Sequence, residues 1–208
     1  MKPPEAAWVV CGRNIPEPGL LARAAWTPSL RAMPSVKELR ALPQVDVRTF
    51  QSEHGPVALI QQPPAPVFQR VAQQMGGART VFMAHRSRLA DRLMAMLQGF
   101  EHLQVLFLNP KTDGEVFAVG RLETSSLVIH DPSVSKFHAL VRWSAADGNC
   151  FVRDAGSMNG TFVNAIALGE QEQQLVDGDG LSFGDAQFLY VRTDTLHAHL
   201  AMAAPVSR

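Results

Sequence analysis

The sequence predicts an α+β fold in which an antiparallel β-sandwich follows a smaller α/β or helix-strand region. Three observations predict it. After Lys111, short β-type runs alternate with turns that contain Gly, Asn and Asp, a pattern typical of a sandwich. Before residue 103, β-type runs alternate with amphipathic helical stretches, a pattern typical of an α/β unit. With 46% apolar residues among 208, the chain holds enough apolar material for a core.

Composition divides the chain into four expected segments. Residues 1–44 are rich in proline and lack a periodic apolar pattern, so we expect an irregular arm there. Residues 45–102 are expected to form the small α/β or helix-strand region, and residues 103–195 the sandwich. Residues 196–208 are expected to end the chain as a short helix or tail.

The small α/β region has alternating elements. Its predicted strands are residues 45–50, 56–61 and 80–84. Its predicted helices are residues 66–75 and 89–100, the second with a face formed by Leu89, Leu93, Leu97 and Phe100. The next strand, residues 104–108, either closes this region or opens the sandwich, and periodicity does not decide between the two.

The charge balance argues against two classes of partner. The chain has 19 Lys and Arg against 19 Asp and Glu, so its net charge is zero, and we expect neither nucleic-acid nor membrane-surface binding. The charges are unevenly placed, however. Residues 1–100 carry 12 basic and 6 acidic side chains, and residues 101–208 carry 7 and 13. This division arises by chance or marks two regions that face each other.

The cysteines and the N-terminus indicate a cytoplasmic protein without a metal or cofactor. Cys11 and Cys150 are too few and too far apart for a zinc cluster or a disulfide framework, so we expect free thiols. No apolar run is long enough for a membrane span, and Pro3, Pro4 and Glu5 interrupt the pattern of a signal peptide.

Three motifs occur in order in the predicted sandwich: residues 119–121 at the end of a strand, residues 135–138 just before a strand, and residues 154–161 at a turn. Together they hold the groups that a phosphorylated threonine needs, because a phosphate presents nearly two negative charges and three acceptor oxygens. Arg121 supplies a planar fork of donors, and Ser135 supplies a hydroxyl. Asn159 donates and accepts at once, which suits a peptide main chain beside the phosphate.

These motifs resemble those of the forkhead-associated (FHA) domain, whose signature is Gly-Arg, then Ser-Arg-x-His, then Ser-x-Asn-Gly-Thr. The Asp-Gly-Asp and Phe-Gly segment at residues 177–184 also matches, and the resemblance covers about residues 103–195. It implies that Arg121 and Ser135 bind the phosphate, with Lys136 adding a contact, and that Asn159 binds the peptide main chain. It also implies peptide contacts from Thr124 and Ser125 and structural roles for Gly120, His138 and Gly160, with His138 tying the loop of Ser135 to the turn before Asn159.

Two positions depart from the family pattern. Met158 stands where the family often has Ser or Thr beside the threonine methyl group, so we expect the preference for threonine over serine to survive with some loss of affinity. Ser133 stands where selectivity for the residue three beyond the phosphothreonine is often set. A small neutral side chain there argues against a strong preference for an acidic residue.

The resemblance implies a non-catalytic module that binds a phosphothreonine-containing protein, namely a Ser/Thr kinase or its substrate. No P-loop, H-E-x-x-H, G-x-S-x-G or CxxC motif favours an enzyme. An alternative function is a structural module that binds a protein partner independently of phosphate, which the uneven charge would support. Self-association is a third interpretation, in which Thr27, Thr49 or Thr80 is phosphorylated and bound by a second copy.

Overall fold

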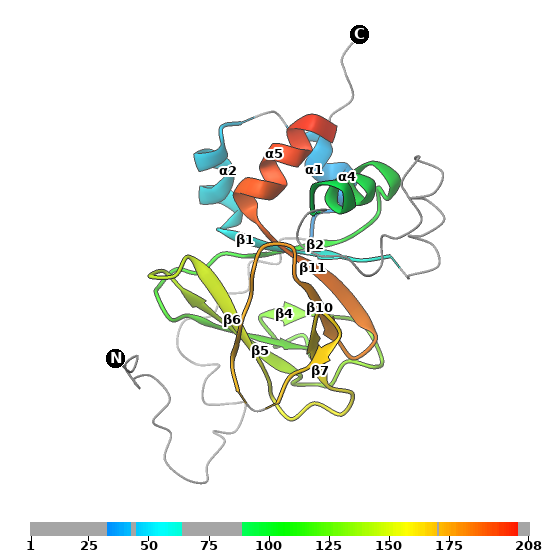
Figure 1. Ribbon diagram of the computed structural model, residues 1–208, viewed down its shortest axis with the longest axis vertical. Helices are drawn as coiled ribbons and strands as arrows, with labels where there is room; N and C mark the ends of the chain where they lie inside the picture. Colours follow the sequence, from blue (N-terminus) through cyan, green and yellow to red (C-terminus); the bar gives the residue numbers. More distant parts are fainter. Residues whose placement is uncertain (1–32, 43–44, 64–88, 170, 204–208) are drawn as a thin grey trace. The chain divides into compact units, whose positions relative to one another are not determined.

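Two β-sheets pack face to face in the computed structural model, which describes residues 33–42, 45–63, 89–169 and 171–203 (Figure 1). The larger sheet has six strands in the order β2-β1-β11-β10-β7-β8, and the smaller has five in the order β4-β3-β5-β6-β9. Among the described residues, all strand pairings are antiparallel except that of β3 with β4. The predicted sandwich is therefore confirmed.

The strands are short, as the sequence pattern predicted. Those of the larger sheet are β1 (Val57–Gln61), β2 (Val105–Leu108), β7 (Thr161–Val163), β8 (Ile166–Ala167), β10 (Gly180–Phe183) and β11 (Ala186–Arg192). Those of the smaller sheet are β3 (Val116–Gly120), β4 (Leu127–Val128), β5 (Ala139–Ser144), β6 (Asn149–Asp154) and β9 (Gln173–Gln174). The described helices are α1 (Val36–Ala41), α2 (Val47–His54), α4 (Leu89–Gly99) and α5 (Thr193–Ala203).

Strand β1 lies inside the larger sheet although it comes from the segment before residue 103. It pairs with β11 from Val57↔Arg192 to Gln61↔Phe188 and with β2 on its other side. Strand β2 is the edge strand of this sheet and pairs with β1. The run at residues 104–108 is therefore a strand of the sandwich that pairs with a strand from the segment before residue 103. These two strands thus join the N-terminal elements to the sandwich.

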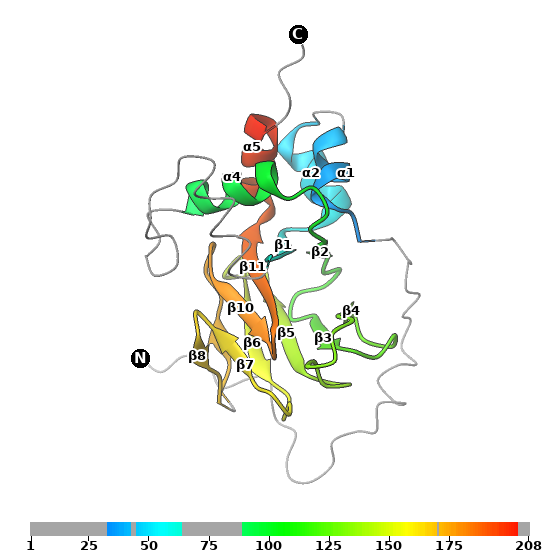
Figure 2. The same cartoon turned by 90° about the vertical axis from the view of Figure 1, so that its right-hand side faces the viewer.

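The part of the larger sheet formed by β1, β2 and β11 is buried on both faces, and the helices lie over it (Figure 2). Val57 and Leu59 of β1 contribute to the core between the sheets, whereas Ala58 and Ile60 contribute to a second core shared with the helices. Successive side chains of a strand point to opposite faces, so a continuous apolar run such as residues 57–60 is what a doubly covered strand requires. Leu93, Met96, Leu97 and Leu196 supply the helical side of the second core.

Two expectations for the N-terminal segments were wrong. Residues 45–50 were predicted to be a strand, but residues 47–54 form helix α2. The Asp46 side chain accepts hydrogen bonds from the N–H groups of Arg48 and Thr49, which caps the helix and outweighs the β-propensity of Val45 and Val47. Within the expected irregular arm, residues 36–41 form helix α1, where Ser35 and Glu38 make a capping box.

Other predicted elements agree with the structure or lie outside it. The helix predicted at residues 89–100 is α4, and the predicted C-terminal helix is α5. The helix predicted at residues 66–75 and the strand predicted at 80–84 lie outside the described residues.

Candidate functional site

Arg121 immediately follows strand β3 and is held along the connection between β4 and β5. Its backbone N–H donates to the carbonyl of Ser135 at 3.0 Å, and its side-chain Nε–H donates to the carbonyl of Val134 at 3.2 Å. The side chain is exposed. The guanidinium therefore lies beside the loop that carries Ser135, with its orientation set by one hydrogen bond.

Gly120 makes this approach of the two segments feasible. A Cβ atom at residue 120 would lie 2.2 Å from the carbonyl oxygen of Lys136, closer than any real contact. The backbone N–H of Leu122 also points to that oxygen, at 3.5 Å. Only a residue without a side chain fits where the strand passes so near the loop.

His138 connects the loop of Ser135 to the turn that contains Gly160. The N–H of Ser135 donates to Nδ1 of His138 at 3.0 Å, and Nε2 lies 3.1 Å from the carbonyl oxygen of Gly160. Because Nδ1 accepts, the ring proton is on Nε2 and is donated to Gly160. Burial lowers the pKa of His138, against smaller opposing effects of Gly160 and Asp154, so the imidazole is neutral.

Ser135 and Asn159 join the same two segments at the surface. The hydroxyl oxygen of Ser135 accepts from the N–H of Met158 at 3.0 Å, and the side-chain amide of Asn159 donates to the carbonyl of Ser133 at 2.7 Å. The Met158 side chain is 89% exposed. The structure therefore brings Ser135, Met158 and Asn159 together, next to the loop along which Arg121 lies.

Asp154 organises the turn that carries Met158 and Asn159, and sequence reasoning did not single it out as a site residue. Its carboxylate accepts from the N–H groups of Gly156 and Ser157, and from the hydroxyls of Ser157 and Thr161, all at 2.6 to 2.8 Å. Burial raises the pKa of Asp154, but these hydrogen bonds outweigh burial and the net pKa is lowered. An Asp followed by Gly, Ser and Thr at two, three and seven residues was the available signal.

Two cationic side chains lie at the surface of this region, whose residues Arg121, Ser135, Lys136 and Asn159 we call the rim. Arg121 and Lys136 are both exposed, and within the part of the chain that the structure describes neither forms an ion pair. Of the Arg121 guanidinium, only Nε has a hydrogen-bond partner among those residues. The terminal nitrogens of Arg121 and the ammonium of Lys136 thus have no hydrogen-bond or ion-pair partner among the described residues.

Three of the residues expected at the peptide differ in how they face the surface. Thr124 is exposed, but Ser125 is only 5% exposed, and its hydroxyl packs against Gly120. Ser133 is also engaged internally, because its hydroxyl donates to Asp131 at 2.6 Å and accepts from the N–H of Asp185 at 2.8 Å. Ser125 is buried, and the Ser133 hydroxyl forms two hydrogen bonds within the protein. Both side chains therefore stabilise the local structure.

Other kinds of site were also sought in the described residues. No group of three or more His, Cys, Asp or Glu side chains there could hold a metal ion. No helix in the same residues has the length and apolar character needed to cross a membrane. Cys150 is a buried free thiol, and burial raises its pKa to about 12, which makes it unreactive.

Comparison with known proteins identifies the family of the sandwich. The sequence model of the FHA domain matches residues 117–184. These residues form an FHA domain. The match runs from Phe117, the second residue of β3, to just after β10, and it contains every residue of the rim described above, so the resemblance of the motifs is confirmed. Strands β1, β2 and β11 and the helices lie outside the match.

Solved structures similar to this chain are also FHA domains. The FHA domain of the CT664 protein from Chlamydia trachomatis is 18% identical, with 65% of this chain and 96% of that chain covered and a TM-score of 0.43. An FHA domain from Arabidopsis thaliana is 29% identical, with 43% and 74% covered and a TM-score of 0.38. The N-terminal FHA domain of S. cerevisiae Rad53p, solved with a phosphothreonine peptide, is 20% identical, with 48% and 91% covered and a TM-score of 0.39.

Proposed function

We propose that the FHA domain of this chain binds phosphothreonine peptides at the rim formed by Arg121, Ser135, Lys136 and Asn159, without catalysing a reaction. The observation that carries this proposal is the state of Arg121. Its Nε is fixed to the carbonyl of Val134, while its terminal nitrogens have no partner among the described residues. A guanidinium held in this way presents two donors to a phosphate.

The hydroxyl of Ser135 has the complementary property. Its oxygen already accepts from the N–H of Met158, and the described residues offer no acceptor for its proton. A hydroxyl donates one proton and accepts at its lone pairs, so the proton of Ser135 is left for a phosphate oxygen. Lys136 adds a second cation at the same rim, as a point charge on a flexible stem.

Asn159 supplies the contact to the peptide main chain. One amide proton binds the carbonyl of Ser133, which fixes the plane of the side chain. The second amide proton and the carbonyl oxygen remain for a peptide carbonyl and N–H. Met158 beside it is exposed and apolar, which provides a surface for the threonine methyl group, and exposed Thr124 is placed on the loop after Arg121.

The partner that fits this site is a protein carrying a phosphorylated threonine. We infer that it is a Ser/Thr kinase or a substrate of one, because such kinases generate the modification. Binding is static recognition, since the site combines fixed donors with a neutral, buried His138.

The test compares peptide binding by wild type and Arg121→Ala, measured by fluorescence anisotropy. Truncating one partner of a charge-assisted contact costs several kcal/mol, so we expect Arg121→Ala to weaken phosphothreonine binding by about 50-fold or more. Phosphoserine peptide should bind wild type more weakly, and unphosphorylated peptide not measurably. Arg48→Ala is the matched control, because Arg48 is an exposed arginine on helix α2.

Two results would contradict the proposal. One is equal affinity of wild type and Arg121→Ala for the phosphothreonine peptide, and the other is equal binding of the phosphorylated and unphosphorylated peptides. Sizing of the protein with and without salt then separates the structural alternative. If the protein associates whether or not phosphopeptide is present, and if added salt disrupts this association, the result favours a phosphate-independent assembly module.

A further inference from the structure

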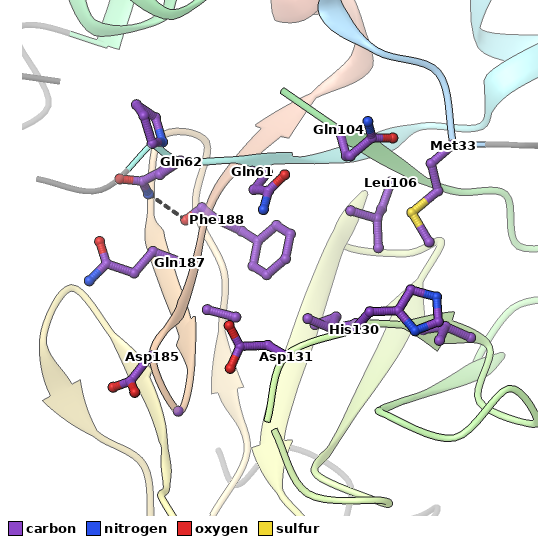
Figure 3. A pocket seen from close by; sticks show the side chains of 15 residues that line it. Met33, Gln61, Gln62, Gln104, Leu106, His130, Asp131, Asp185, Gln187 and Phe188 are labelled. Atoms are coloured by element: carbon purple, nitrogen blue, oxygen red, sulfur yellow. Dashed lines mark hydrogen bonds between the residues drawn. The ribbon is translucent and has the colours of Figure 1, made fainter. Parts of the chain in front are cut away.

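A pocket of about 530 Å³ is lined by residues of both sheets and of the loops between their strands (Figure 3). Part of its wall belongs to the FHA match, including Asp131 and the residues just before it. The remainder comes from elements outside the match, including Met33, Gln61, Gln104, Leu106 and Phe188. The pocket is therefore built jointly by the FHA domain and the strands that the N-terminal segments add.

Ser133 forms the connection between this pocket and the peptide site. Its carbonyl oxygen accepts from the Asn159 side chain at 2.7 Å, on the side of the proposed peptide. Its hydroxyl donates to Asp131 at 2.6 Å and accepts from the N–H of Asp185 at 2.8 Å, and both of these aspartates line the pocket. Ser133 thus links Asn159, the proposed peptide contact, to two residues that line the pocket.

The charge of the pocket is negative. Among the described residues that line it, Asp131 and Asp185 are acidic, His130 is the one titratable base, and Lys and Arg are absent. Asp131 uses one carboxylate oxygen for the backbone and hydroxyl of Ser133. The exposed carboxylate of Asp185 has no hydrogen-bond or ion-pair partner among the described residues, although its backbone is fixed by Ser133.

The rest of the lining suits a long side chain with an apolar stem. Met33, Leu106 and Phe188 present apolar surface, and the amides of Gln61 and Gln104 supply acceptors near them (Figure 3). Lys and Arg bury an aliphatic stem against such surface while their cationic end stays with polar groups. An acidic side chain would instead meet two like charges.

We propose that this pocket takes a Lys or Arg side chain from the sequence that flanks the phosphothreonine, with Asp185 and Asp131 as its ionic partners. This inference rests on the proposed function of the rim. It makes the ligand bipolar: the phosphate binds at Arg121 and Lys136, and a basic residue of the same peptide binds at the acidic pocket beyond Ser133.

The test uses phosphothreonine peptides with an alanine background in which Lys is placed at each flanking position in turn. At one position, we expect Lys to tighten binding by about two- to fivefold, the strength of a partly exposed ion pair. Asp185→Asn should remove this gain and leave the affinity for the all-alanine peptide unchanged. Asp185→Lys should reverse the preference, so that a peptide with Glu at that position binds more tightly than a peptide with Lys. Asp185 is chosen because its side chain holds no structural hydrogen bond among the described residues.

Asp91→Asn on helix α4 is the matched control, because Asp91 is also an exposed aspartate, and it should keep the gain. Equal binding of Lys and Ala peptides at every position would overturn the inference, as would a gain that survives Asp185→Asn. If binding depends on Arg121 but shows no basic preference, only the pocket is misassigned. If no phosphopeptide binds, the proposed function fails and this inference fails with it.

Discussion

His138 shows how a single side chain fixes the rim of the FHA domain. Its ring accepts from the N–H of Ser135 and lies against the carbonyl of Gly160, so it determines the distance between the loop of Ser135 and the turn of Asn159. The two bonds form together only when the ring is neutral and carries its proton on Nε2. Protonation would place a second proton on Nδ1, opposite the Ser135 N–H, and would break that bond.

The pH dependence of stability follows from this residue. Burial lowers the pKa of His138 in the folded protein, so below about pH 6.5 the unfolded chain binds a proton that the folded one does not. We expect the unfolding free energy to fall as the pH is lowered from that value toward the folded pKa. Urea unfolding over this pH range measures it. His138→Gln should show a shallower slope, while His130→Gln, at an exposed histidine, should match wild type.

At the scale of elements, strand β1 is the most consequential feature. Its alternate residues enter two separate cores, with Leu59 between the sheets and Ile60 beneath the helices. Both side chains are almost completely buried, at 1% and 0% exposure. A change in this strand therefore loosens the helical layer or the sandwich, depending on the residue chosen.

Ile60→Ala is expected to destabilise the fold by about 2–5 kcal/mol, because it removes a fully buried side chain and leaves a cavity. Ile60→Val should cost about 0.5–1.5 kcal/mol. Denaturant unfolding gives both values. Gln61→Ala changes the next residue of the same strand, which is exposed, and should stay near wild type. A loss for Ile60→Ala no larger than that for Gln61→Ala would contradict the doubly buried strand.

The sequence predicted the parts of this architecture that depend on local signals. The strands of the sandwich, helix α4 and the turn at Asn159-Gly160 follow from periodicity and turn residues close together in the chain. The candidate site residues were predicted because a family signature gives them in order, and their roles stay a prediction. Local caps were misjudged, since Asp46 and Ser35 start helices in segments where β-branched residues and prolines dominated the interpretation.

Non-local contacts could not be predicted in this way. Strand β1 pairs with β11 across more than a hundred residues, and nothing in either run specifies its partner. The hydrogen bond from the N–H of Asp185 to the Ser133 hydroxyl likewise joins residues 52 positions apart, so its effect on the proposed peptide site becomes visible only in three dimensions.

At the scale of the whole molecule, the FHA match and the cooperative folding unit differ in extent. The match ends before β11 and begins after β2, yet β1 lies between these two strands and pairs with both. Val57 and Leu59 complete the core between the sheets, and the helices before and after the sandwich share the second core with α4. We therefore propose that the described residues between 33 and 203 fold as one cooperative unit.

This proposal predicts that a fragment comprising residues 103–208 does not fold. Without β1, strands β2 and β11 lose their common partner, and apolar side chains of both cores, such as Leu181 and Leu189, lose packing neighbours. We expect the fragment to lack dispersed amide NMR signals and a cooperative thermal transition, whereas a fragment of residues 33–208 shows both. Adding a peptide of residues 45–63 is the control, since it supplies β1 and should restore some order. A stable, cooperatively folded fragment of residues 103–208 would show that β1 is an accessory strand, and the sandwich would then be independent of the N-terminal elements.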